Sequence, residues 1–252
     1  MIGELIGIRP ETREDFLGWT DALVEALPGD AGGDAARAPA ASMYRAFAAL
    51  LEERRRAPRD DLASALLAAE IDGVRLSERE LLGFCFVLIV AGNDTTTNLV
   101  ANGAVLLARH PDQRKLLAED PARLPNAIEE MLRLESPAQA LPRVLRRDVT
   151  LHGVRMPAGA LVRLVWGAAN RDPREFEEPE RFDVARALRR HLGFGHGIHF
   201  CLGAHLARLE ARIAFEELLA RIPGYALERE PGWRRSIWAR AHDAVPVVFD
   251  PA

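Results

Sequence analysis

The sequence predicts a mainly α-helical fold with a minor β part, and three observations carry that prediction. Apolar residues recur at the spacing of amphipathic helices over most of the 252-residue chain. Residues 148–173 contain short β-type runs separated by Gly and Pro turns. The length is that of one large domain or two small ones, and the chain shows no internal repeat.

Composition and charge narrow the class of protein. With 48% hydrophobic and 28% charged residues, the chain has the make-up of a soluble globular protein. A net charge of -4 without a basic stripe argues against nucleic-acid binding. The two cysteines, Cys85 and Cys201, are too few for a disulfide framework and favour a reducing compartment, which we take to be the cytoplasm. The first residues turn polar too early for a signal peptide, and the apolar run 81–92 is shorter than the ~20 residues of a membrane span, so we expect no membrane association.

Helical spacing predicts three helices in the first part of the chain. They are expected at residues 11–27, at about 43–56 and at about 61–70. Residues 29–41 are rich in Gly, Ala and Asp and are expected to form a flexible loop. The longest helix should begin at Ser77, which forms a capping box with Glu80, and end at about Arg109, before His110 and Pro111.

The second part of the chain mixes helices with short strands. Further helices are expected at about 112–117, at about 124–134 and over a last amphipathic segment that ends near Ile222. Between them, residues 148–173 are expected to form short strands, and residues 178–190 are irregular and rich in charge. The tail, residues 233–249, can add a final strand or two.

The segment AGNDTT, residues 91–96, places polar residues inside the longest predicted helix. A glycine in a helix centre costs about 1 kcal/mol relative to alanine. One interpretation is that the helix surfaces here and that Asp94 and the threonines face water, because polar residues are mostly exposed. The other is a local break, in which Gly92 allows a close approach while Asp94 and Thr95 present an acid and a hydroxyl.

A second segment, EEMLRLESP at 129–137, places Glu130 and Arg133 on one helix face because they are three residues apart. As a surface ion pair they would contribute a few tenths of a kcal/mol to stability. As a buried bidentate pair they would need further hydrogen-bond partners to offset desolvation. From the spacing alone, the surface ion pair is the expected interpretation.

The third segment is FGHGIHFCLG, residues 194–203, which brings Cys201 to the start of the last helix. A helix N-terminus stabilises a thiolate through its dipole and its free N–H groups. Gly195, Gly197 and Gly203 permit tight turns and close approach of the backbone to a flat group. Cys85, inside an apolar run, is expected to be a small buried hydrophobe.

Three chemistries can use a thiolate at this position. A zinc site would combine Cys201 with His205 and with His199 or His196, but such sites usually have a second cysteine close by, and this chain has none there. A Cys–His nucleophile is the second possibility. The third is a single axial thiolate on haem iron, for which His199 and nearby arginines would supply cations for the propionates.

Taken together, the three segments resemble the cytochrome P450 family. FGHGIHFCLG matches the family's cysteine-ligand loop at every fixed position, Glu130 and Arg133 match its Glu-x-x-Arg, and residues 91–96 match its oxygen-activating segment. Residues 170–173 and 179–183 also resemble family segments, and the chain order agrees. The resemblance covers almost the whole chain but only the later part of such a protein. It therefore implies the C-terminal portion of the cytochrome P450 fold, with residues 1–252 forming a single partial domain.

The resemblance implies roles for the residues of the cysteine loop. Cys201 would be the proximal ligand of the iron of haem b. Arg143 and His199 would bind haem propionates. The remaining residues of this group would pack against the ligand loop or temper the thiolate with their N–H groups, and they are Phe194, Gly195, Leu202 and Gly203.

For the longest helix, the resemblance implies that Ala91 and Gly92 line the distal face of the haem. Thr95 would steady bound dioxygen and its protons, and Asp94 would relay them. Glu130 and Arg133, together with Arg181, would form a network that holds the fold and takes no part in the chemistry.

The function implied is that of a haem–thiolate monooxygenase, which activates dioxygen to oxygenate an apolar organic substrate. Electrons would come from a separate ferredoxin- or flavodoxin-type donor with its reductase. The alternative is a truncated, catalytically inactive remnant of such an enzyme, with weak or no haem binding.

Overall fold

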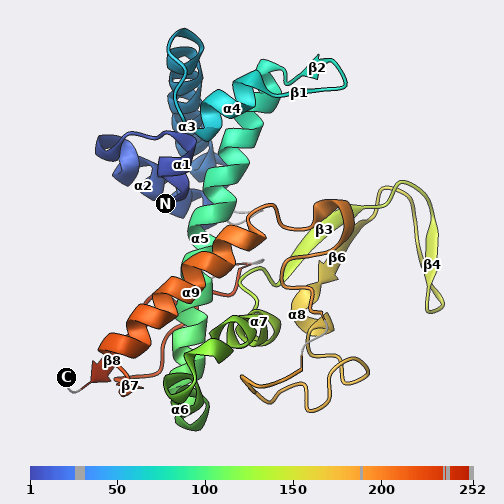
Figure 1. Cartoon of the computed structure of the whole chain (residues 1–252). Helices are drawn as coiled ribbons and strands as arrows, with labels where there is room; N and C mark the ends of the chain where they lie inside the picture. The colour runs from blue at the N-terminus through green and yellow to red at the C-terminus, as the bar shows by residue number, and fades with distance from the viewer. Residues whose placement is uncertain (26–31, 188–189, 235, 237–238, 250–252) are drawn as a thin grey trace. The chain divides into compact units, whose positions relative to one another are not determined.

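The computed structural model describes residues 1–25, 32–187, 190–234, 236 and 239–249 (Figure 1). The chain divides into two compact units, Met1–Asp94 and Thr95–Ala252. The division falls inside the longest helix, α5, which spans Glu78–Arg109. Both units are mainly helical, as the sequence predicts, and their strands form only two-stranded antiparallel sheets. Whether residues 1–252 behave as a single domain stays a prediction.

The first unit is built from helices and one small hairpin. Its elements before α5 are α1 (Ile2–Ile6), the 3₁₀ turn η1 (Pro10–Thr12), α2 (Arg13–Glu25), α3 (Gly32–Arg56), α4 (Leu62–Ala68), β1 (Glu70–Ile71) and β2 (Val74–Arg75). The capping box at the start of α5 is present, because the Glu80 carboxylate accepts from the N–H of Ser77 at 2.8 Å. The N-terminus of α4 is capped by Asp61, whose carboxylate accepts from the N–H of Ser64.

The core of the first unit lies between α2, α3 and the first half of α5. Met43, Phe47 and Leu51 recur every four residues on α3 and are completely buried. The ring of Phe47 lies 5.1 Å from that of Phe16 on α2. Helix α5 contributes three further buried side chains, which are Leu81, Cys85 and Ile89. Burial raises the pKa of Cys85 to about 11, so this thiol is inert.

One expectation for the first unit is wrong. Residues 32–41 belong to helix α3 and not to a flexible loop, although the helix contains Pro39. Four alanines, at positions 36, 38, 40 and 41, have the highest helix propensity of any residue, and this favours the helix over a loop. Residues 29–31 of the expected loop lie outside the described residues.

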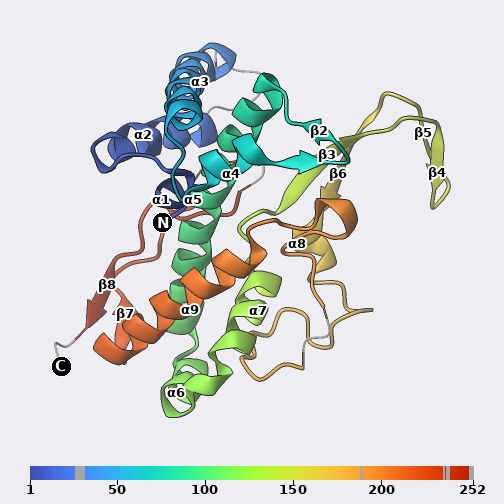
Figure 2. The same ribbon diagram turned by 45° about the horizontal axis from the view of Figure 1, so that its top comes forward.

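The second unit carries the remaining helices and three of the small sheets (Figure 2). Its first elements after α5 are α6 (Pro111–Glu119), η2 (Pro121–Arg123), α7 (Leu124–Leu134), β3 (Ala140–Val144), β4 (Val149–Leu151), β5 (Val154–Met156) and β6 (Leu161–Val165). They are followed by α8 (Trp166–Ala169), η3 (Gly197–His199), α9 (Ala204–Arg221), β7 (Tyr225–Leu227) and β8 (Val247–Phe249). The antiparallel pairs are β3 with β6, β4 with β5, and β7 with β8.

Helices α7 and α9 lie side by side in both views and share the core of the second unit with the second half of α5. The buried side chains of this core include Leu99 and Leu107 from α5, Ile128 and Met131 from α7, and Phe215 from α9. Gly103 lets α5 approach its neighbours closely, because a Cβ there would lie 2.5 Å from Phe215 Cζ and 2.7 Å from Met131 Sδ.

Among the described residues, α5 alone is long and apolar enough to cross a membrane by length and composition. The apolar run 81–92 is shorter than a span, but the whole helix has 32 residues. Its buried side chains belong to the cores of the two units, and 28% of its apolar 18-residue window is buried. One such helix is weak evidence for a membrane span, because core helices of globular proteins pass the same test.

Candidate active site around Cys201

The cysteine loop, residues 194–203, is a tight turn that leads into α9. The N–H of Cys201 donates to the carbonyl of Phe194 at 2.9 Å and closes the loop. Gly195 and Gly197 have φ angles of 71° and 68°, in the left-handed region that favours glycine. Gly195 and Gly197 are thus favoured by the backbone path that brings the cysteine to the helix, whereas Gly203 has an ordinary φ of -83°.

The N-terminus of α9 surrounds Cys201 with unused donors. The helix begins at Ala204, and the N–H of Ala204 donates to the carbonyl of Cys201 at 3.3 Å. The N–H groups of Leu202 and Gly203 have no hydrogen-bond partner among the described residues. Free N–H groups at this end of a helix favour a negative charge, so the position suits a thiolate.

Cys201 is half-buried, and its neighbours in the loop include solvent-exposed apolar side chains. Ile198 is 98% exposed and Leu202 is 72% exposed, while Phe200 is about half exposed. Large apolar side chains gathered on a surface mark a place where an apolar partner binds. The ring of His199 is exposed and has no hydrogen-bond partner within the described part of the chain. A thiol donor, apolar neighbours and an available imidazole fit one face of a haem with carboxylate side chains.

The two other chemistries open to a thiolate find no support. Among the described residues, no group of three or more His, Cys, Asp or Glu side chains is arranged to hold a metal ion, which disfavours zinc. The structure also records no hydrogen bond between the Cys201 sulfur and a histidine ring in the segments it describes, as a Cys–His nucleophile would need.

The residues of the AGNDTT segment lie on an uninterrupted helix. Asp94 is only 6% exposed and therefore does not face water, whereas Ala91 is exposed. Gly92 is half-buried, and a Cβ there would lie 3.3 Å from Ile2 Cγ1, so packing against α1 accounts for this glycine. Ala91, Gly92 and Asp94 belong to the first unit, and Thr95 opens the second.

Arg143 lies on β3 opposite Val162 of β6 and is half-buried. Its guanidinium donates to the carbonyl of the neighbouring Pro142 at 2.9 Å. Among the described residues, no hydrogen bond or ion pair joins Arg143 to the cysteine loop, so its assignment to a propionate stays a prediction.

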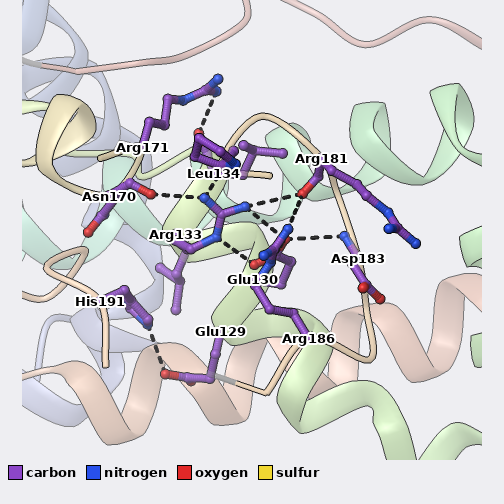
Figure 3. A network of polar contacts seen from close by, with 12 residues as sticks. Glu129, Glu130, Arg133, Leu134, Asn170, Arg171, Arg181, Asp183, Arg186 and His191 are labelled. Carbon is purple, nitrogen blue, oxygen red and sulfur yellow. Dashed lines mark hydrogen bonds and ion pairs between the residues drawn. The ribbon is translucent and has the colours of Figure 1, made fainter. Parts of the chain in front are cut away.

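Glu130 and Arg133 form a completely buried, bidentate ion pair on α7 (Figure 3). Arg133 Nε lies 2.7 Å from one carboxylate oxygen of Glu130, and Nη2 lies 2.8 Å from the other. The other guanidinium hydrogens donate to backbone carbonyls, those of Asn170, Pro179 and Arg181. The pair thus has the additional partners that offset its desolvation.

The network differs from the expectation at Arg181. That residue contributes its carbonyl oxygen only, because its exposed guanidinium pairs with Glu178 at 2.8 Å. Arg186 supplies the side chain instead, and its Nε donates to Glu130 Oε1 at 3.0 Å. The N–H of Asp183 reaches the same oxygen at 3.2 Å. Arg186 carries no local signal in the sequence, since its partner lies 56 residues earlier.

A second charged cluster adjoins the buried pair and was not anticipated. Glu129 accepts two hydrogen bonds from Arg208 of α9, at 2.6 and 2.8 Å, and contacts His191 Nε2 at 3.0 Å. Burial raises the pKa of Glu129, but its bonds with Arg208 and His191 outweigh this and lower the pKa to about 2. Glu129 therefore carries a full negative charge at neutral pH.

The fold and the loop define a class: a mainly helical protein that presents one thiolate ligand at the N-terminus of its last long helix, beside a buried Glu-x-x-Arg pair. Comparison with known proteins agrees. The sequence profile described as "Cytochrome P450" matches residues 34–222. The chain belongs to the cytochrome P450 family, which implies a haem cofactor and the use of dioxygen.

Relatives and solved structures support this assignment along the whole chain. The chain is 44% identical to the "Vitamin D(3) 25-hydroxylase" of Pseudonocardia autotrophica, over 100% of this chain and 62% of that protein. It is also 44% identical to the "Cytochrome P450 monooxygenase PikC" of Streptomyces venezuelae, over 98% of this chain and 60% of that protein. The structure of Cytochrome P450 CYP109Q5 from Chondromyces apiculatus matches with a TM-score of 0.92 and 41% identity, over 100% of this chain and 63% of that one. The chain thus spans roughly three fifths of the length of these relatives.

Proposed function

We propose that the protein is a haem–thiolate monooxygenase that inserts one atom of dioxygen into an apolar organic substrate. The observation that carries the proposal is the half-buried Cys201, which meets unpaired N–H groups at the start of α9 and exposed apolar side chains around it. The fold and the curated relatives support the same activity.

Cys201 would hold the iron of haem b through its sulfur. The N–H groups of Leu202 and Gly203 would donate to that sulfur and temper its charge. Phe194 and Gly195 would hold the loop in shape, while His199 and Arg143 would bind the carboxylates. When bound, the haem supplies the iron on which dioxygen is reduced.

The roles of Ala91, Gly92, Asp94 and Thr95 rest on the resemblance of residues 91–96 to the family's oxygen-activating segment. Ala91 and Gly92 would lie on the distal face. The hydroxyl of Thr95 would hold a proton near bound dioxygen, and the carboxyl group of Asp94 would replace it from water. The burial of Asp94 supports this relay, because a carboxyl group removed from bulk water can pass protons along a fixed path.

The partners follow from the family. Two electrons for each turnover would come from a ferredoxin- or flavodoxin-type donor and its reductase, and we place the protein in the cytoplasm. Two relatives are named "Vitamin D(3) 25-hydroxylase" and "Steroid C26-monooxygenase", and a similar solved structure holds corticosterone. Vitamin D(3), steroids and corticosterone are all apolar molecules. Those names support an apolar organic substrate for this chain.

Carbon monoxide binding tests the proposal. The chain is expressed with a haem supply, reduced and exposed to carbon monoxide. We expect the absorbance band of a thiolate-ligated ferrous complex, its loss in Cys201→Ser, and its retention in Cys85→Ser, which alters a thiol buried in the core. A wild-type chain that takes up no haem would favour the inactive remnant and overturn the proposal.

A further inference from the structure

Arg208 lies in the second turn of α9, seven positions after Cys201, which precedes the first helical residue, Ala204. Both Arg208 Nε and Nη2 bond to Glu129 of α7, which makes the pair bidentate and sets the plane of the guanidinium. The guanidinium carbon lies 4.5 Å from the centre of the Phe194 ring, within the range of a cation–π contact.

Glu129 is in turn held by His191 (Figure 3). The His191 Nδ1 atom accepts the N–H of Gly193 at 3.0 Å, so in this arrangement the ring proton sits on Nε2 and is donated to Glu129. The cluster thus joins the positive charge of Arg208 to the negative charge of Glu129. Neither charge can rotate away without losing two partners.

Phe194 connects Arg208 to the cysteine loop. The guanidinium of Arg208 stacks on the Phe194 ring, and the carbonyl of Phe194 accepts the N–H of Cys201 at 2.9 Å. The hydrogen bond with Glu129 raises the pKa of Arg208 most, and the negative charge of an ionised Cys201 raises it further. Phe194 thus links the guanidinium of Arg208 to the loop that holds the sulfur.

We propose that Arg208 is a positioning residue for the cysteine ligand: Glu129 and His191 hold its guanidinium on Phe194, where its charge makes the iron bound by Cys201 easier to reduce. The physical reason is that the reduced site carries one more negative charge, which a nearby cation stabilises. The inference rests on the proposed function in one respect, that Cys201 binds the haem iron.

The reduction potential of the haem-loaded chain tests the inference. In Arg208→Gln we expect the potential to fall by an amount equal to about a tenfold change in the ferrous-to-ferric ratio, which is 59 mV for one electron. The matched control is Arg212→Gln, one turn further along α9, where an exposed arginine pairs with Glu216 at 3.2 Å. Equal potentials in Arg208→Gln and Arg212→Gln would overturn the inference.

A double-mutant cycle tests the role of Glu129. If Glu129 acts by holding Arg208, then Glu129→Gln changes the potential of the wild type but causes no further change in Arg208→Gln. An equal shift in both backgrounds would show that Glu129 acts on its own. Should Arg208→Gln fail to take up haem, Arg208→Lys keeps the charge but loses the fork, and a potential below that of the wild type is expected. If neither variant takes up haem, Arg208 retains the cofactor instead of setting its potential, and the inference is wrong.

The haem-free chain provides a readout that is independent of the cofactor. We expect the amide hydrogen of Cys201 to exchange with solvent several-fold faster in Arg208→Gln than in Arg212→Gln. The reason is that the variant loses the contact of Arg208 with the Phe194 ring, and the Phe194 carbonyl is the acceptor of this amide hydrogen. Equal exchange rates in the two variants would show that Arg208 does not hold the loop. A wild-type chain without the thiolate band would refute the proposed function and the effect on potential together, while the exchange rates would still decide whether Arg208 holds the loop.

Discussion

Arg186 reaches across 56 residues of sequence to donate to Glu130, at an Nε–Oε1 distance of 3.0 Å. The same carboxylate receives the fork of Arg133 from its own helix. One buried acid therefore ties α7 to the irregular segment that precedes the cysteine loop. The network has no exposed member at its centre, since Glu130 and Arg133 are both fully buried.

Glu130→Ala should destabilise the haem-free chain by about 3–5 kcal/mol, because it leaves two arginines without their counter-charge. Urea unfolding followed by circular dichroism measures the change. Glu216→Ala, which breaks an exposed pair on α9, is the control and should change stability by less than about 0.5 kcal/mol. A Glu130→Ala chain as stable as this control would contradict the structural role of the pair.

Arg186→Ala and Arg181→Ala form a matched pair five residues apart. Arg186→Ala should cost about 1.5–3 kcal/mol, because it removes charged hydrogen bonds to Glu130 and to the carbonyls of Glu177, Glu178 and Arg181. Arg181→Ala should be close to neutral, since only an exposed pair with Glu178 is lost. The order of the two unfolding free energies is the measurement, and the reverse order would place the side-chain role on Arg181.

Gly103→Ala should destabilise the second unit by about 1–3 kcal/mol through overpacking, since the new Cβ would meet Phe215 and Met131. Gly83→Ala is the control on the same helix, where a Cβ meets nothing within 4 Å. That substitution should stabilise the protein by about 0.5–1 kcal/mol, because alanine is the better helix former. Thermal unfolding of both variants shows whether the two effects have opposite signs.

Acid stability should depend on Glu129. The folded-state pKa of about 2 lies below the ordinary value of 4.5, so the carboxylate's contribution is complete above pH 4.5 and is lost as the pH falls toward 2. Glu129→Gln should therefore remove part of the acid dependence of the unfolding free energy in that window. Arg208→Gln removes the main partner and should have a similar effect. If the unfolding free energy of both variants falls between pH 4.5 and pH 2 as it does in the wild type, the Glu129–Arg208 pair is not formed in solution.

Thr95→Ala should keep the haem and the thiolate-ligated carbon monoxide complex but lose coupling between dioxygen use and product. We expect most of the dioxygen consumed to appear as hydrogen peroxide, because the variant lacks the hydroxyl that we propose holds a proton near bound dioxygen. Peroxide and product are measured together for each electron delivered. Thr97→Ala, which alters an exposed threonine two residues on, should leave that ratio unchanged.

Local patterns in the sequence predict much of the fold and the loop, whereas the charged clusters needed the structure. The stop before Pro111, the capping box at Ser77 and the glycines of the cysteine loop are each fixed by neighbouring residues, so they can be read locally. The spacing of Glu130 and Arg133 shows a shared face but not whether that face is buried. The partners of Glu129 lie 62 and 79 residues away, and no periodicity links such positions.

The start of α3 shows the opposite limit. Gly, Asp and Pro between residues 29 and 41 are usual signs of a loop, yet the helix begins at Gly32 and accommodates Pro39. Alanine propensity and continuity with the well-packed stretch around Met43 and Phe47 outweigh the local breakers. A single proline is therefore a poor guide to a helix end when the flanking residues are strong helix formers.

Ile198 and Leu202, left in water on either side of Cys201, also bear on how the protein is made. Until an apolar group covers them, these side chains form an exposed apolar patch on each newly synthesised chain. Neighbouring chains can associate through this patch. The yield of dispersed protein should then follow the supply of haem precursor in the culture, with haem-starved cells accumulating the chain in aggregates or on chaperones. Cofactor supply, and not only chain synthesis, would set how much of this protein a cell can keep.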